Sequence, residues 1–255
     1  MVSSNMIVNC PETPQDIKNS DKIFGPDVLS MKGKSIRRCL EAVVSNYVNT
    51  PKEILSMDTG LEVFVGVVFV NKLAFLVSVI RRLKLTTINY IPKSLEKKLA
   101  RSVNNIIDVY KQRHFSIHTM YMDPEFNCLY KLIVSTDLNK NFARDHVPGI
   151  ERHIQIVKER TREFYGGLPY DRMTSRMIVY LHKYVVMMIN AFPPNRSLSR
   201  TYSPCNIMMG KQLDFKKQCR CPFGGYIKDH NNRNVTNVMV DRTQGIICLS
   251  PTGNL

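Results

Sequence analysis

The chain has 255 residues, 44% of them apolar, so it can bury a sizeable core and is not a disordered protein. Lys and Arg number 36 against 21 Asp and Glu, which gives a formal net charge of +15. This excess predicts binding to a polyanion, most simply nucleic acid, and argues against an acidic extracellular module. The 7 cysteines are odd in number and scattered, so they form no disulfide framework and favour a reducing, intracellular compartment.

The sequence predicts neither a signal peptide nor a membrane span. No basic segment followed by an apolar stretch and a small-residue cleavage site opens the chain. The most apolar long run, 177–192, contains His182 and Lys183 and falls short of the roughly 20 residues that a membrane-spanning helix needs. We therefore expect a soluble protein with no membrane partner.

Residues 1–57 are polar and predict a basic linker with little core of its own. They contain several prolines and the basic cluster Lys32–Arg38. A short helix is predicted over 36–48, where apolar residues recur at helical spacing. A solvated surface arm and a nucleic-acid contact explain this segment equally well.

The next part of the chain predicts strands. Apolar runs at 61–70 and 73–80 flank Asn71-Lys72, a pattern typical of a β-hairpin. Their continuous apolar character is typical of strands covered on both faces. Further strands are predicted over 85–91 and 115–122, and 132–135 is a candidate for a short fifth strand.

Helices alternate with these strands and then follow them. Pro92 opens a predicted helix whose apolar stripe ends at Tyr110. A charged helix is predicted over 148–165 and a more buried one over 173–192. This order predicts an α/β fold with a mixed sheet and helices on its faces. From 197 onward the composition shifts toward Gly, Asn and Cys.

Two carboxylates stand out as candidates for chemistry. The chain has no phosphate-binding glycine loop, nucleophile elbow or HExxH motif, and the pair Cys219 and Cys221 is typical of two incidental thiols. Asp123 follows the fourth predicted strand and Glu151 opens the charged helix. Carboxylates so placed can hold divalent metal ions, and a two-metal site activates a hydroxyl for attack on phosphorus. An Asp-Pro turn and a helix-dipole contact explain the same residues.

Short stretches over nearly the whole chain match one known family and keep its order. They are Asp16–Lys18 and Ile23–Asp27; Val67–Asn71 with Phe75–Val77; Met122–Phe126; Asp145–Pro148, Ile150–Arg152 and Lys158–Arg160; Ile189–Pro193; Ser203–Pro204 with Ile207–Asp214; and Gly245–Leu249 with Pro251–Asn254. Through these residues the sequence resembles the integrase core of copia-type LTR retrotransposons, in particular the diatom lineage.

The resemblance implies an RNase H-like fold with a mixed five-stranded sheet, in which three antiparallel strands are followed by parallel strands. It also implies DNA strand transfer by an Asp, Asp, Glu triad with Mg²⁺ or Mn²⁺. Asp123 matches the second acid and Glu151 the third, 28 residues later, a shorter spacing than is usual for integrases. The implied partners are element ends, target DNA and further copies of the chain, in a nucleus or a cytoplasmic retroelement particle.

The first acid of the triad is missing. The family places it five positions before Asn71, where this sequence has Gly66. Glu62 lies on the same strand face but about 13 Å away. Asp58 is farther still, and nothing places Asp145 at the first strand. We therefore predict that the site lacks one of its metal ligands and that this copy is catalytically inactive or nearly so.

The charged helix is the predicted DNA-binding element. Gln155, Lys158 and Arg162 follow Glu151 at spacings of four, three and four and so share its face. In the family this helix lies along the DNA end, so the resemblance implies phosphate contacts from that face. A solvated helix with internal salt bridges explains the pattern equally well. A second basic region comprises Arg81, Arg82, Lys84, Lys97, Lys98 and Arg101.

The sequence thus predicts three parts: a linker at 1–57, an integrase-like core at 58–195 and a C-terminal extension at 196–255. The extension resembles the region that follows the core in the same elements, and we expect the chain to be truncated within it. Two alternatives stay open. A non-catalytic nucleic-acid-binding remnant would bind DNA equally well without magnesium. A structural module retained as a multimer partner would have no affinity for DNA even at low salt.

Overall fold

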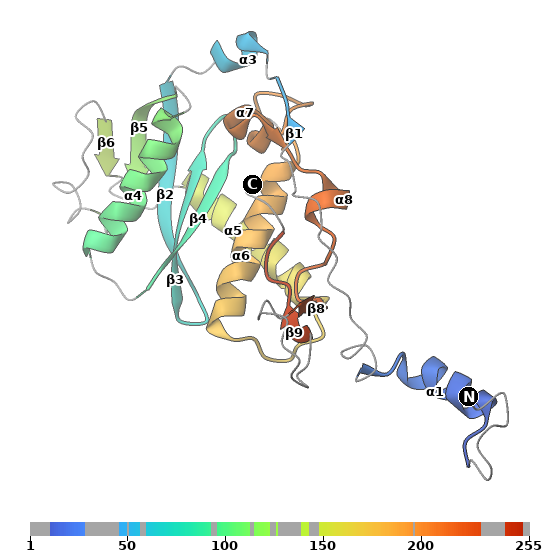
Figure 1. Cartoon of the computed structure of the whole chain (residues 1–255). Helices are drawn as coiled ribbons and strands as arrows, with labels where there is room; N and C mark the ends of the chain where they lie inside the picture. The colour runs from blue at the N-terminus through green and yellow to red at the C-terminus, as the bar shows by residue number, and fades with distance from the viewer. Residues whose placement is uncertain are drawn as a thin grey trace. The chain divides into compact units, whose positions relative to one another are not determined.

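The computed structural model describes residues 11–28, 46–49, 51–56, 60–92, 96–112, 115–122, 126, 139–142, 148–195, 197–230 and 243–251. The chain divides into two compact units. Figure 1 labels the helices and strands of both. One comprises Met1–Ala42 and Gly225–Ile247, and the other comprises Val43–Gly224 and Cys248–Leu255.

The larger unit contains most of the helices and strands. In chain order they are β1 (Asn46–Tyr47), α3 (Lys52–Ser56), β2 (Gly60–Val70), β3 (Leu73–Ile80), β4 (Thr86–Ile91), α4 (Glu96–Lys111), β5 (Ser116–Met122), β6 (Asn139–Phe142), α5 (Pro148–Gly166), α6 (Ser175–Ala191), α7 (Pro204–Met209), β7 (Lys211–Gln212) and α8 (Phe215–Gln218).

The central sheet of this unit has the strand order β4-β3-β2-β5-β6. β2 pairs antiparallel with β3, which pairs antiparallel with β4. On its other side β2 pairs parallel with β5, and β5 pairs parallel with β6. The result is a mixed sheet flanked by helices, an arrangement compatible with the RNase H-like fold.

A two-residue turn fixes the register of the β2–β3 hairpin. Asn71 and Lys72 have φ values of 49° and 65°, so both occupy the left-handed region. A turn with two positive φ values matches the right-handed twist of antiparallel strands, and Asn tolerates this conformation well. The pairing then runs from Val70–Leu73 to Val63–Ile80.

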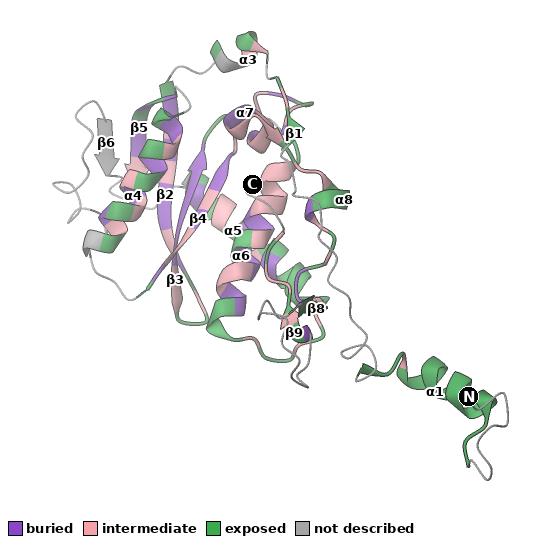
Figure 2. Ribbon diagram, in the orientation of Figure 1, coloured by how far each residue is buried: buried purple, intermediate pink, exposed green. Residues whose placement is uncertain are grey.

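Alternate residues of β2 pack into two separate cores. Leu61, Val63 and Val65 belong to a core that contains the buried stripe of α4 and residues of α7. Phe64 and Val68 belong to the core on the other face, beneath α5 and α6. Both faces are therefore covered, as the continuous apolar runs predicted. Figure 2 shows the buried residues concentrated along these strands.

The smaller unit contains α1 (Pro14–Phe24), β8 (Tyr226–His230) and β9 (Thr243–Ile247), with β8 and β9 paired antiparallel. α1 has no buried residue and is held by its own N-terminal cap. The Thr13 hydroxyl accepts from the Asp16 amide at 3.2 Å, and the Asp16 carboxylate accepts from the Thr13 amide at 2.9 Å. The predicted linker therefore contains a helix that its polar composition did not indicate, although the Thr13–Asp16 spacing is that of a cap.

The predicted hairpin, the next two strands and the last two long helices lie within two residues of their expected bounds. The strand candidate at 132–135 lies outside the described residues, and the outer strand β6 was not predicted. The prediction of a helix over 36–48 is wrong at its C-terminal end, because Asn46 and Tyr47 form a strand that pairs with β7. No helix in the described part of the chain is long and apolar enough to span a membrane.

Candidate functional site

Gly66 lies in the middle of β2, opposite Val77 of β3. It is buried, and its position between Phe64 and Val68 puts it on the face covered by α5 and α6. On the other side of β2, Val65 pairs with Met122, the last residue of β5. The residue that follows Met122 is Asp123, which lies outside the described residues.

The start of α5 approaches β2 closely at this level. A side chain at Gly149 would lie 3.3 Å from the Phe64 ring, so glycine allows the helix to contact the strand. Glu151 is two residues along the helix from this contact, and Gly66 is two residues along the strand. Glu151 is exposed, whereas its neighbour Ile150 is 1% exposed and anchors the helix in the core.

The acids considered as replacements for the first triad residue do not fill the gap among the described residues. The Glu62 carboxylate accepts a hydrogen bond from the Arg81 guanidinium at 2.7 Å, and the Arg81 amide donates to the Glu62 carbonyl at 3.0 Å. This contact raises the pKa of Arg81 and occupies Glu62 at the start of β2. Asp58 and Asp145 lie outside the described residues.

The expected metal site lies only partly within the residues that the structure describes. Within the described ranges, no group of three or more His, Cys, Asp or Glu side chains could hold a metal ion. Of the three positions expected to form the triad, these ranges contain Glu151 and Gly66, and Gly66 has no side chain. The metal site at Asp123 and Glu151 therefore stays a prediction.

The predicted DNA-binding face of α5 is one continuous helical face. Lys158 and Arg162 line a cavity of about 640 Å³ at the end of the β2–β3 hairpin. Gln155 does not line this cavity, and its amide donates to Glu159 at 2.8 Å. On the far side of the helix, Arg160 pairs with Glu163 at 2.8 Å. The structure thus brings two of the three predicted residues together.

The second basic region is divided between two faces. Arg81 and Lys84 line a cavity of about 330 Å³ beside Phe64 and the start of α5. Lys98 and Arg101 are exposed on α4, which packs on the opposite face of the sheet. The sheet therefore separates the two groups of basic residues; nothing is described of the Lys97 side chain.

Two histidines are held neutral by burial. His153 shares a hydrogen bond with the Thr86 hydroxyl, and burial together with the Lys84 ammonium lowers its pKa to about 4. His182 is 2% exposed and stacks on Phe75, with ring centroids 4.7 Å apart. Burial lowers the pKa of His182 as well.

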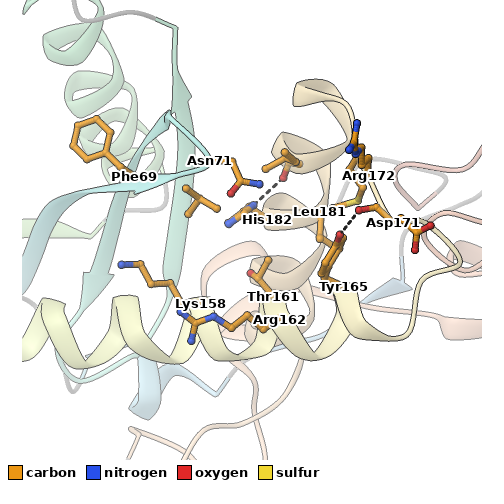
Figure 3. A pocket seen from close by; sticks show the side chains of 13 residues that line it. Phe69, Asn71, Lys158, Thr161, Arg162, Tyr165, Asp171, Arg172, Leu181 and His182 are labelled. Carbon is orange, nitrogen blue, oxygen red and sulfur yellow. Dashed lines mark hydrogen bonds between the residues drawn. The ribbon is translucent and has the colours of Figure 1, made fainter.

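The position of His182 at the large cavity was not predicted. Its side chain lines the same cavity as Lys158 and Arg162 (Figure 3). The one signal in the sequence is a histidine inside an otherwise apolar helix, and by itself it indicates only an interruption of the apolar run.

A third cysteine, Cys248, lies close to the pair Cys219 and Cys221. The Cys248 sulfur lies 3.8 Å from the carbonyl oxygen of Cys221, and Cys219, Cys221 and Cys248 are all free thiols. Burial and the neighbouring Cys248 raise the pKa of Cys219 and of Cys221. The Cys219 and Cys221 thiols are therefore favoured in their protonated form.

No protein-family model matches the sequence, and no curated protein matches it either. Among solved structures, the chain is similar to the catalytic core domain of BIV integrase. The identity is 17%, the match covers 58% of this chain and 93% of that one, and the TM-score is 0.43.

Proposed function

We propose that this chain is an integrase-like core of the RNase H-like superfamily, related to copia-type retrotransposon integrases, that binds DNA but has lost strand transfer. The observation that carries the proposal is Gly66, buried in β2 beside the start of α5. In the family pattern this strand position carries the first acid. The proposed second and third acids are Asp123 and Glu151.

The strand arrangement and the sequence motifs support this proposal together. The parallel pairing of β2 with β5 places Val65 beside Met122. Gly66 is the next residue in the sequence after Val65, and Asp123 is the next residue after Met122. The helix that carries Glu151 begins on the same face of β2 as Gly66. A divalent ion such as Mg²⁺ or Mn²⁺ would supply charge stabilisation at phosphorus, and glycine removes a ligand for it.

DNA binding depends on other residues and is expected to persist. Lys158 and Arg162 lie one helical turn apart on α5, at the mouth of the large cavity. With a formal net charge of +15, the chain as a whole attracts polyanions. Contacts of these side chains with phosphates give salt-dependent binding with little sequence preference. Element ends and target DNA are the proposed ligands, and further copies of the chain are proposed partners.

The catalytic half of the proposal is tested by restoring the acid. In a strand-transfer assay with Mn²⁺ and a duplex oligonucleotide, the natural chain gives no joined product and Gly66→Asp gives a measurable amount. Gly66→Asn is the matched control, because it adds a side chain of the same size without a carboxylate. Gly66→Asp combined with Glu151→Gln abolishes the restored product.

Two results would contradict this half of the proposal. One is strand transfer by the natural chain. The other is a Gly66→Asp variant that folds, as judged by circular dichroism, and binds DNA but yields no product.

The DNA-binding half is tested by the salt dependence of affinity for a blunt duplex. The slope of log K against log salt is negative, and each lost phosphate contact makes it less negative by about 0.9. Lys158→Ala combined with Arg162→Ala therefore makes the slope less negative by about 1.8. Arg160→Ala, on the other side of the same helix, leaves it unchanged. A natural chain with no affinity at low salt would instead favour the structural-module alternative.

A further inference from the structure

Three of the cysteines that the structure describes lie together in the larger unit. Cys219, Cys221 and Cys248 are free, partly buried thiols. The Cys248 sulfur lies 3.8 Å from the Cys221 carbonyl oxygen, and the thiols of these two residues form a hydrogen bond with each other. Cys248 is also close enough to Cys219 to act on its charge. Cys248 is therefore the shared neighbour of the other two, and Cys221 is the one that it contacts.

The backbone brings Cys221 and Cys248 together at the point where the chain leaves the larger unit and returns to it. That unit ends at Gly224 and resumes at Cys248, and the Gly224 amide donates to the Cys248 carbonyl at 2.8 Å. A carbonyl oxygen lies about 2.4 Å from the Cα atom of its own residue, so the Cys248 sulfur lies within about 6 Å of the Cys221 Cα atom. In disulfides the two Cα atoms are usually about 4–7 Å apart, so this approach is of the size that a disulfide needs.

Packing against α6 holds both segments in place. Leu249 follows Cys248 and packs in the cluster that contains Val185 of α6 and Phe223. Phe223 follows Cys221 by two residues and is 6% exposed. Each of the two cysteines therefore has a neighbour in sequence that anchors its segment in the same apolar cluster.

Two chemistries suit neighbouring thiols, a soft metal ion and a disulfide. Structural zinc sites hold the ion with four Cys or His ligands. Among the described residues no group of three or more His, Cys, Asp or Glu side chains could hold a metal ion, so these three thiols do not converge on one ion. A disulfide needs only two sulfurs in contact, and Cys221 and Cys248 meet this requirement. The geometry favours the disulfide.

We propose that Cys221 and Cys248 are a reversible redox pair, which closes to a disulfide under oxidising conditions and fastens residues 248–251 to the loop 219–224. The two cysteines are 27 positions apart, so the closed ring contains both β8 and β9. In a reducing compartment the pair stays as two thiols until an oxidant arrives.

The reaction balances with a low-molecular-weight disulfide such as oxidised glutathione. One protein thiolate attacks a sulfur of the oxidant, which forms a mixed disulfide and releases one glutathione thiolate. The second protein thiolate attacks the protein sulfur of the mixed disulfide and releases the other. Two protein S–H bonds are lost and one S–S bond forms, and the two electrons and two protons leave in two molecules of reduced glutathione. Burial and the neighbouring Cys248 raise the pKa of Cys221, so its thiolate is scarce and the reaction is slow at neutral pH.

The experiment equilibrates the natural chain with mixtures of oxidised and reduced glutathione, quenches with acid, blocks the remaining thiols and identifies the linked peptides after trypsin. Arg220 separates Cys219 from Cys221, so trypsin places the three cysteines on three peptides, 218–220, 221–228 and 243–255. We expect 221–228 linked to 243–255 as the main product, with a loss of two thiols from the 7 of the chain.

The folded chain should favour this bond far more than the unfolded chain does. A disulfide that closes a ring of this size stabilises a folded protein by an amount equivalent to about a hundredfold in an equilibrium constant. By linkage, the constant for oxidation of the pair by glutathione should be about a hundredfold larger in the native chain than in concentrated urea.

Single variants assign the bond to its two sulfurs. Cys221→Ser and Cys248→Ser each abolish the linked peptide, and circular dichroism checks that they fold. Cys219→Ser leaves the link in place. Cys205→Ser is the matched control, because it removes another partly buried thiol, on α7, and should leave the oxidation constant unchanged.

Three results would overturn the inference. The first is a main product that links 218–220 to 243–255, or no linked peptide at all. The second is the same oxidation constant in the native chain and in urea, which would show that the fold does nothing to bring the sulfurs together. The third is one Zn²⁺ bound per chain that protects all three thiols from oxidation, which would make the group a metal site.

Discussion

The Asn190 side chain connects the end of α6 to the edge strand β4 by hydrogen bonds. Its removal tests how strongly α6 is held on the sheet. Its side-chain amide donates to the Thr86 carbonyl at 2.7 Å and accepts from the Thr86 amide at 2.9 Å. Thr86 is 1% exposed, so water has little access to either group. One side chain therefore satisfies both backbone groups of a buried residue.

The cost of losing this clamp follows from the two groups it leaves behind. A buried amide or carbonyl without a partner costs about 1–3 kcal/mol. Two such groups would cost about 2–6 kcal/mol together if both stayed without a partner. Because some water enters the space that the side chain leaves, we expect Asn190→Ala to lower the free energy of unfolding by about 2–4 kcal/mol. Domains of this kind have total stabilities of about 5–15 kcal/mol, so the change is readily measured.

Urea denaturation followed by circular dichroism measures the difference. Arg176→Ala, an exposed position on the same helix, is the matched control and should stay within about 0.5 kcal/mol of the natural chain. Asn190→Asp keeps the acceptor and replaces the donor by a carboxylate oxygen facing the Thr86 carbonyl. Its carboxyl group must take up a proton to restore the second hydrogen bond, so this variant gains stability relative to the natural chain as the pH falls. A loss below about 0.5 kcal/mol for Asn190→Ala would refute the reasoning.

Two further predictions concern the same face of the sheet. Ile150→Ala removes a side chain that is 1% exposed beneath α5, and denaturation should show a loss of about 2–5 kcal/mol, whereas exposed Arg152→Ala should show almost none. The free energy of unfolding should fall as the pH drops through about 6.5, because the pKa values of His153 and His182 are lowered in the folded chain and the unfolded chain takes up both protons first. His182→Phe should reduce the slope of this dependence between pH 7.5 and 5.5 and leave the part that His153 contributes; an unchanged slope would show that His182 contributes nothing to it.

The sequence predicted those elements whose residues determine them locally. The hairpin follows from two apolar runs and from Asn71-Lys72, where an asparagine begins a turn with two positive φ values. α5 and α6 follow from helical spacing, which also placed Lys158 and Arg162 on one face. The first two strands and these helices were therefore accessible without a structure.

Other elements depend on residues far away in the chain. β6 is the polar segment Asn-Lys-Asn-Phe, which has little strand preference and is extended because it pairs with β5. β1 is extended because Asn46 and Tyr47 pair with Gln212 and Lys211. The cavity of about 640 Å³ likewise exists only where the β2–β3 hairpin meets α5 and α6, so the position of His182 in a helical run could not reveal it.

We propose that the loss of catalysis and the retention of DNA binding are separable on this fold, because different segments of the same two elements would carry them. Along β2, Gly66 and Phe69 are three residues, about 10 Å, apart. Along α5, Glu151 and Lys158 are seven residues, also about 10 Å, apart. The strand and the helix each run from the proposed catalytic position to the cavity at the end of the β2–β3 hairpin, which Phe69 and Lys158 line. Glycine in place of an acid at position 66 would remove a metal ligand and none of the groups that line this cavity. We therefore expect a chain without the first acid to keep its contacts with DNA, and we expect Gly66→Asp to restore joining without any change at Lys158 or Arg162.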